Sequence, residues 1–190
     1  MNTVTGSTGF LGTALVERLL RSAPGCRLVL LIRPGRRSDA NRRANREIFR
    51  NDAFDRLRDL WGDQFQATLD RRVTAVAGDV GTDGLGLDDD GRAAFADCDI
   101  VIHSAATVSF DSPLDAAVEV NLLGPTRIAA ALNELGVTPH LVAVSTCYVA
   151  GSRRGAAPEE RVEERDFFTE DKTLSFETAI IIRHQGYHLF

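Results

Sequence analysis

Lysine and cysteine are scarce in this sequence. It has 190 residues, one lysine and three cysteines. Cys26, Cys98 and Cys147 lie far apart and form no C-x-x-C pair, so neither a disulfide framework nor a zinc site is indicated. We interpret the cysteines as buried small residues and expect no bound metal.

Long apolar runs are also lacking. No run approaches the ~20 residues that span a bilayer, and the N-terminus shows no basic region followed by an apolar one. We therefore expect a cytoplasmic protein with no membrane span. The formal net charge is −5 at pH 7, which argues against nucleic acid as the main partner. The hydrophobic content of 44% is typical of one globular domain with a substantial core.

Three glycines stand between a short β-type stretch and a helical pattern near the start of the chain. Gly6, Gly9 and Gly12 have G-x-x-G-x-x-G spacing, which favours a dinucleotide site. Gly6 permits a sharp turn, Gly9 lets the backbone approach a pyrophosphate, and Gly12 lets the helix pack close to the sheet. The helix N-terminus would offer N–H groups and partial positive charge to the phosphates. An ordinary strand-to-helix turn can show the same spacing.

Strand and helix patterns alternate over the first 150 or so residues. Apolar runs at 27–32, 73–77, 100–102 and 141–144 predict parallel strands after the first one. Helical spacing predicts helices within 11–20, 38–69, 92–96 and 114–135, with a kink at Pro125. This order predicts an α/β protein with a Rossmann-type doubly wound parallel sheet, truncated after about the fifth strand. Ligands bind such sheets at the carboxyl ends of the strands.

Six segments, in this order, resemble the extended short-chain dehydrogenase/reductases. Within them, the fatty acyl-CoA reductase branch (male-sterility-type NAD(P)-binding domain) and the thioester reductases are most similar. The segments are TGSTGFLG at 5–12, LLIRP at 30–34, GDV at 78–80, VIHSAATVSF at 101–110, NLLG at 121–124 and VSTCYVAG at 144–151. The resemblance implies an NAD(P)-binding Rossmann domain at 1–151. It also implies that 152–190 is an incomplete connection to a missing substrate-binding region.

The resemblance places the cofactor contacts at the strand ends. The candidate cofactor-binding residues are Gly6, Ser7, Thr8, Gly9, Phe10, Leu11, Gly12, Arg33, Arg43, Asp79, Val80, Ser104, Ala105, Ala106 and Ser145. His103 and Asn121 are expected to be structural.

Arg33 indicates which dinucleotide is preferred. It lies twenty-one residues after Gly12, where an NAD-selective site would carry an acid for the ribose 2′-OH. A guanidinium group can instead hold the 2′-phosphate of NADP with two hydrogen bonds. We therefore predict NADP(H), with Arg33 as the main contact and Arg43 as a second. Alternatively, Arg33 caps a strand end, and the arginine-rich stretch at 33–50 is a solvated helix face.

Two other strand ends have open interpretations. Asp79 either accepts a hydrogen bond from the adenine amino group, as the resemblance implies, or stabilises the turn after Gly78. Ser104, Ala105 and Ala106 are small either because the backbone passes close to the ribose and nicotinamide or because a buried strand end favours small residues.

The catalytic residues implied by the resemblance are only partly present. Thr146 occupies the position of a hydroxyl that donates to the substrate carbonyl, with Ser145 as the alternative. The Tyr-x-x-x-Lys pair is missing, because Phe168 stands four residues before Lys172. We therefore expect the NADP(H)-binding portion of an oxidoreductase that converts an acyl-CoA or acyl-carrier thioester to aldehyde or alcohol, inactive alone.

Two alternatives remain: a non-catalytic NADP(H)-binding module or subunit, and a fragment of a nucleotide-sugar epimerase or dehydratase. Residues 178–190 resemble nothing expected of the family, which leads to the hypothesis of a truncated or frame-shifted reductase whose frame is lost near Glu177. The sequence does not indicate an oligomeric state or an acyl chain length.

Overall fold

Five parallel strands form one sheet in the computed structural model, which describes residues 1–36, 38–109, 111, 113–145 and 155–156. Within this part of the chain the strand order is β3-β2-β1-β4-β5. The strands are β1 (Asn2–Thr5), β2 (Leu28–Ile32), β3 (Val73–Ala77), β4 (Ile100–His103) and β5 (His140–Ala143). The predicted Rossmann-type α/β fold is confirmed.

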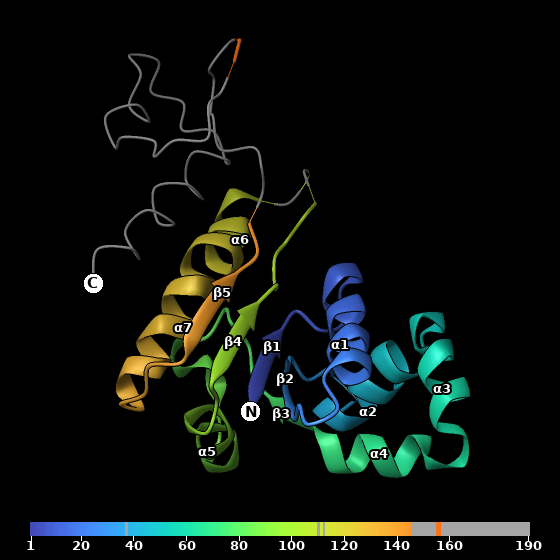
Figure 1. Cartoon of the computed structure of the whole chain (residues 1–190). Helices are drawn as coiled ribbons and strands as arrows, with labels where there is room; N and C mark the ends of the chain where they lie inside the picture. Colours follow the sequence, from blue (N-terminus) through green and yellow to red (C-terminus); the bar gives the residue numbers. More distant parts are fainter. Residues whose placement is uncertain (37, 110, 112, 146–154, 157–190) are drawn as a thin grey trace, which may run out of the picture.

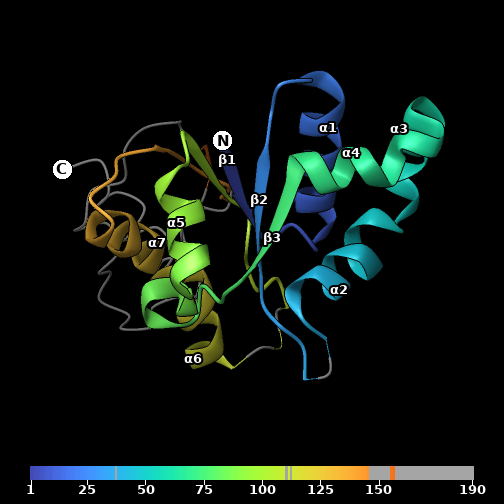
Figure 2. The same ribbon diagram turned by 90° about the horizontal axis from the view of Figure 1, so that it is seen from below.

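Helices cover both faces of the sheet (Figures 1 and 2). One face carries α1 (Phe10–Ser22), α2 (Ala40–Ala44), α3 (Asp55–Trp61) and α4 (Phe65–Arg72). The other carries α5 (Asp89–Ala96), α6 (Leu114–Ala117) and α7 (Leu123–Glu134). No helix in the described ranges is long and apolar enough to cross a membrane.

Strand β2 shows why the sheet needs helices on both faces. All five of its residues are buried. Leu28, Leu30 and Ile32 belong to the hydrophobic cluster on the α1 face, while Val29 and Leu31 belong to the cluster with α5 and α7. Removing this apolar surface from water on both sides stabilises the sheet by ~25 cal/mol per Å².

The predicted helical stretch at 38–69 is helical but broken. A π-helical turn, η1 (Asn45–Phe49), and a 3₁₀ turn, η2 (Asp52–Phe54), separate α2 from α3, and a second 3₁₀ turn, η3 (Gly62–Gln64), separates α3 from α4. The breaks have local causes. Asn51 caps a new turn by accepting a hydrogen bond from the Ala53 N–H, and Gly62 has a φ of +48°. Side-chain capping of this kind competes with helix continuation.

The kink expected at Pro125 is replaced by an irregular turn before it. A π-helical turn, η5 (Val118–Leu122), connects α6 to α7, and Pro125 lies in the first turn of α7. In a regular helix the proline ring would clash with the carbonyl of Asn121, four residues earlier. Asn121 lies inside the π-helical turn, where the backbone departs from the regular helix.

The cysteines that the structure describes are not exposed. Cys98 is buried, and Cys26 is half-buried. Burial raises the pKa of the Cys98 thiol, which outweighs the opposing effect of its contact with the Thr3 hydroxyl. Both cysteines are therefore small packing residues, while Cys147 lies outside the described residues.

Arg72 links α4 to the end of α1 by hydrogen bonds. Its guanidinium group donates to the carbonyls of Leu20 at 2.8 Å, Ala23 at 2.7 Å and Cys26 at 3.0 Å. These carbonyls lie at or just after the C-terminus of α1, where a helix leaves carbonyl groups unpaired. The same guanidinium lies over the Trp61 ring, 5.8 Å from its centre.

Replacing Arg72 tests this link between α4 and α1. We expect Arg72→Lys to lower the free energy of unfolding by about 1–3 kcal/mol, because an ammonium group cannot reach three carbonyls with a planar fork. Arg71→Lys is the matched control, since Arg71 is exposed and its guanidinium group makes one long contact, 3.4 Å, with the Thr68 hydroxyl among the described residues. Urea denaturation measures both variants. Equal losses of unfolding free energy in the two variants would show that Arg72 does not link α4 to α1 specifically.

Candidate functional site

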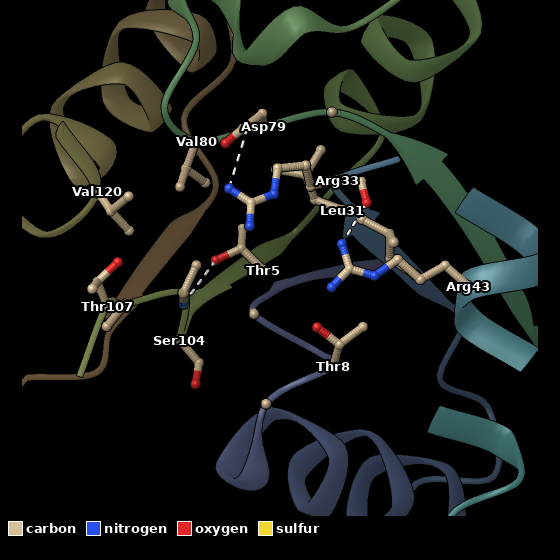
Figure 3. A pocket seen from close by; sticks show the side chains of 16 residues that line it. Thr5, Thr8, Leu31, Arg33, Arg43, Asp79, Val80, Ser104, Thr107 and Val120 are labelled. Atoms are coloured by element: carbon tan, nitrogen blue, oxygen red, sulfur yellow. Dashed lines mark hydrogen bonds and ion pairs between the residues drawn. The ribbon is translucent and has the colours of Figure 1, made fainter. Parts of the chain in front are cut away.

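A cleft lies at the carboxyl ends of the strands, where the strand order reverses. Strand β1 pairs with β2 on one side and with β4 on the other. Crossovers then lead away in opposite directions and leave a crevice. The cleft is lined by Thr5, Gly6, Thr8, Gly9, Leu31, Ile32, Arg33, Arg43, Gly78, Asp79, Val80, Ser104, Ala105, Ala106, Thr107 and Val120. Figure 3 shows the two arginines toward one end and Thr107 and Val120 toward the other.

The glycine turn is packed between the end of β4 and α1. Gly6 has a φ of +70°, and a Cβ atom there would lie 2.5 Å from the backbone nitrogen of Ala105. A Cβ atom on Gly12 would lie less than 3.0 Å from the Gly6 carbonyl and from the Ser7 Cα. Gly12 therefore lets α1 pack against the turn itself, rather than against the sheet as expected.

The N-terminus of α1 directly follows this turn, and no side chain caps it. Gly9 is the N-cap residue and has no side chain to accept a hydrogen bond, and Thr13 is the first residue whose N–H reaches back to the Gly9 carbonyl, at 2.9 Å. The N–H groups of Phe10, Leu11 and Gly12 are those that a helix start leaves unpaired. An anionic phosphate group fits here, since it would accept from these groups and meet the positive end of the helix dipole.

The side chains within the glycine motif lie in three different places. Phe10 is 98% exposed, and neither Phe10 nor Leu11 contributes its side chain to the cleft lining. Thr8 lines the cleft. Ser7 is 1% exposed, and its hydroxyl is the buried side-chain oxygen without a hydrogen-bond partner among the described residues. Backbone groups are thus what Ser7, Phe10 and Leu11 could offer a ligand.

Arg33 and Asp79 face each other across one end of the cleft. The Arg33 Nη1 lies 3.8 Å from the Asp79 Oδ2, and the Arg33 side chain is 65% exposed. The Asp79 Oδ1 accepts a hydrogen bond from the Gly81 N–H at 2.9 Å. The two interpretations of Asp79 are therefore compatible: one oxygen stabilises the turn, and the other faces the cleft.

Arg43 is held more firmly than Arg33. Its Nη1 donates to the Arg33 carbonyl at 2.6 Å, and its Nε donates to the Glu47 Oε2 at 2.8 Å. Figure 3 shows the guanidinium group between the end of β2 and the glycine turn that carries Thr8. The structure thus places both predicted arginines in the cleft.

The segment after β4 forms the opposite wall, and its backbone is tied at two points. The Asn121 side chain accepts from the Thr107 N–H at 2.7 Å and donates to the Thr107 carbonyl at 2.8 Å. The buried Thr5 hydroxyl lies 2.7 Å from the His103 Nδ1 and accepts from the Ala105 N–H at 3.4 Å. His103 and Asn121 thus have structural contacts.

Most of the remaining predicted residues are found at the cleft as well. Ser104, Ala105, Ala106 and Val80 line it. Ser145 is exposed two residues after β5 and does not line the cleft in the part of the chain that is described. Thr146 lies outside the described residues. Within the described ranges no group of three or more His, Cys, Asp or Glu side chains could hold a metal ion.

Sequence inspection overlooked several wall residues. Thr5, Leu31, Ile32, Gly78, Thr107 and Val120 also line the cleft. All of them except Val120 lie inside the segments that carry the family resemblance, and Val120 directly precedes the segment at 121–124. Taking every residue of these segments as a candidate, with one residue before each, would have found them. The structure also shows why residue 78 is a glycine, since a Cβ atom there would lie 2.8 Å from the Leu85 carbonyl.

Comparison with protein families and curated proteins gives consistent matches. The family model described as "Male sterility protein" matches residues 4–187. "Fatty acyl-CoA reductase 8" of Arabidopsis thaliana is 35% identical over 161 residues, which are 83% of this chain and 32% of that protein. "Alcohol-forming fatty acyl-CoA reductase" of Simmondsia chinensis is 32% identical over 163 residues, with the same two coverages. The chain thus spans about a third of the length of these relatives.

Solved structures agree on the fold. The terminal R domain from the myxalamid PKS-NRPS biosynthetic pathway superposes with a TM-score of 0.71 at 23% identity, over 97% of this chain and 43% of that one.

The family match extends to residue 187. Similarity to the family therefore continues past Glu177, into residues that were expected to be unlike the family.

Gly12 tests the packing of the glycine turn. We expect Gly12→Ala to lower the free energy of unfolding by about 1–3 kcal/mol, because the added methyl group meets backbone atoms that cannot move aside. Gly25→Ala is the control, since a Cβ atom at Gly25 has no atom within 4 Å. Chemical denaturation compares the two variants, and a Gly12→Ala chain as stable as Gly25→Ala would contradict the packing described.

Proposed function

The chain belongs to the Male sterility protein family of NAD(P)-binding domains, and from this we propose that it is the NADP(H)-binding portion of a reductase of acyl thioesters. One observation carries the proposal: an uncapped helix N-terminus and two arginines meet in a single cleft. The names of the fatty acyl-CoA reductases support fatty acyl-CoA as the substrate class.

The glycine turn would hold the pyrophosphate. Backbone N–H groups of Phe10, Leu11 and Gly12 would donate to it, and the missing side chain of Gly9 leaves the approach open. The adenosine half would then lie toward Arg33 and Asp79, and the nicotinamide half toward residues 104–107. This orientation follows from the ends of the cleft at which these residues lie (Figure 3).

The arginines support NADP over NAD. Arg33 would hold the 2′-phosphate with two hydrogen bonds, and Arg43 would add a second cation beside it. The Asp79 carboxylate, whose Oδ2 lies 3.8 Å from the Arg33 Nη1, would attract the Arg33 guanidinium to this end of the cleft. Its Oδ2 atom would be available to the adenine amino group.

Binding without turnover is the second part of the proposal. The reduced nicotinamide, when bound, supplies a hydride to an acyl carbonyl carbon. Thr146, directly after Ser145 in the sequence, would donate a hydrogen bond to the carbonyl oxygen. The chain has no Tyr-x-x-x-Lys pair to protonate that oxygen, since its one lysine follows Phe168 by four residues. These features also support a binding module or subunit without catalysis as the second candidate.

Titration with the two reduced dinucleotides tests the cofactor preference. We expect NADPH to bind about 10- to 100-fold more tightly than NADH, since charge-assisted hydrogen bonds of this kind are worth about 1.5–3 kcal/mol. Arg33→Ala should remove most of this preference and leave NADH binding unchanged. Arg36→Ala is the control, because Arg36 is exposed on the same segment and does not line the cleft. Equal affinities of the unaltered chain for NADPH and NADH would contradict the proposal.

NADPH oxidation in the presence of a long-chain acyl-CoA tests the lack of turnover. We expect no acyl-CoA-dependent oxidation by the chain alone, because the loss of a positioned acid typically costs about 10²–10⁴-fold in rate. Thr146→Ala should then behave like the unaltered chain. Oxidation that requires both the acyl-CoA and Thr146 would show that another group replaces the missing tyrosine and lysine.

A further inference from the structure

Glu47 connects two arginines behind the cleft. Its Oε2 accepts from the Arg43 Nε at 2.8 Å, and its Oε1 accepts from the Arg46 Nη2 at 2.6 Å. Glu47 itself does not line the cleft, whereas Arg43 does. The carboxylate therefore acts on the cleft through Arg43.

Arg43 is placed by two contacts on different atoms. The bond to Glu47 fixes Nε, and the bond to the Arg33 carbonyl at 2.6 Å fixes Nη1. The second terminal nitrogen, Nη2, remains on the side of the guanidinium that faces the glycine turn with Thr8 (Figure 3). The Arg43 side chain is 23% exposed, against 65% for Arg33. Arg43 is thus the better ordered of the two cations.

We propose that Glu47 is a positioning residue for dinucleotide specificity: it holds the Arg43 guanidinium in the orientation that binds a ribose 2′-phosphate. This inference rests on the proposed function. Ordering a long side chain in advance removes part of the entropy cost of binding. Glu47 contributes nothing to the parts that NAD and NADP share, so its effect is confined to ligands that carry the 2′-phosphate.

The charge of Glu47 must be weighed against this role, because a carboxylate repels a phosphate. Two arginines contact the carboxylate directly, and their positive charges oppose its negative charge. Burial opposes ionisation of Glu47, but the hydrogen bonds from Arg46 and Arg43 outweigh it, so the pKa of Glu47 lies below its usual value. The contact with Arg43 therefore persists at neutral pH.

Two variants separate orientation from charge. Glu47→Asp keeps the charge but is one methylene too short for the 2.8 Å contact with Arg43, whereas Glu47→Gln removes the charge and keeps an acceptor oxygen at the same reach. If Glu47 acts by positioning, Glu47→Asp weakens 2′-phosphate binding more than Glu47→Gln does. If it acts only through its charge, Glu47→Asp behaves as the unaltered chain and Glu47→Gln binds more tightly.

Calorimetric titration with adenosine 2′,5′-bisphosphate and with adenosine 5′-monophosphate measures the effect, because these probes differ only in the 2′-phosphate. We expect Glu47→Asp to weaken binding of the bisphosphate about 2- to 12-fold, the range for ordering one long side chain, and to leave binding of the monophosphate unchanged. Arg43→Ala should lose at least as much, and the double variant no more than Arg43→Ala alone. Glu134→Asp is the control, since Glu134 is exposed on α7.

The outcomes are distinguishable. Unaltered bisphosphate affinity in Glu47→Asp, or an equal loss for both probes, overturns the inference while leaving the proposed function in place. An unaltered chain that does not discriminate between the probes overturns the preference for NADP, and the inference with it. If Glu47→Asp does not fold, the comparison of Glu47→Gln with Arg43→Ala decides: a Gln variant that binds the bisphosphate more tightly than the unaltered chain contradicts positioning.

Discussion

The close approach of backbone to backbone at the glycine turn is the constraint on which the rest of this structure depends. The turn is confined between α1 and the residues that follow β4, and neither Gly6 nor Gly12 has room for a Cβ atom. Parallel pairing of β1 with β4 brings Thr5 opposite His103, so the turn after β1 and the segment after β4 necessarily meet. The cleft exists because these two strand ends are adjacent while the crossovers diverge.

The walls of the cleft are fixed by contacts that lie outside it. Asn121 holds the backbone of Thr107 from α7's side of the sheet, and Glu47 holds Arg43 from the other. Both residues lie in π-helical turns, which occur frequently at functional sites. A ligand in this cleft would therefore meet groups that are already ordered, which lowers the entropy cost of binding.

The sequence predicted what depends on local chemistry. Apolar runs located β2, β3, β4 and β5 to within a residue or two, and the glycine spacing, Arg33 and Asp79 identified the cleft. Contacts between segments that lie far apart in the chain could not be predicted from the sequence. The hydrogen bonds from Arg72 to the end of α1 connect residues almost fifty positions apart. Leu85 has a φ of +59°, and its carbonyl accepts a hydrogen bond from the Asp79 N–H. No periodicity or motif signals either one, because tertiary packing determines both.

On the proposed function, this domain would hold a dinucleotide and would carry only part of the chemistry that uses it. The cofactor would bind across the glycine turn and the ends of β2 and β4. Amide chemical shifts of the labelled chain, recorded with and without NADP⁺, test this most directly. We expect the changes in chemical shift to be concentrated at residues 6–12, 33, 79 and 104–107. Shifts confined to α3 and α4, or none at the glycine turn, would contradict it.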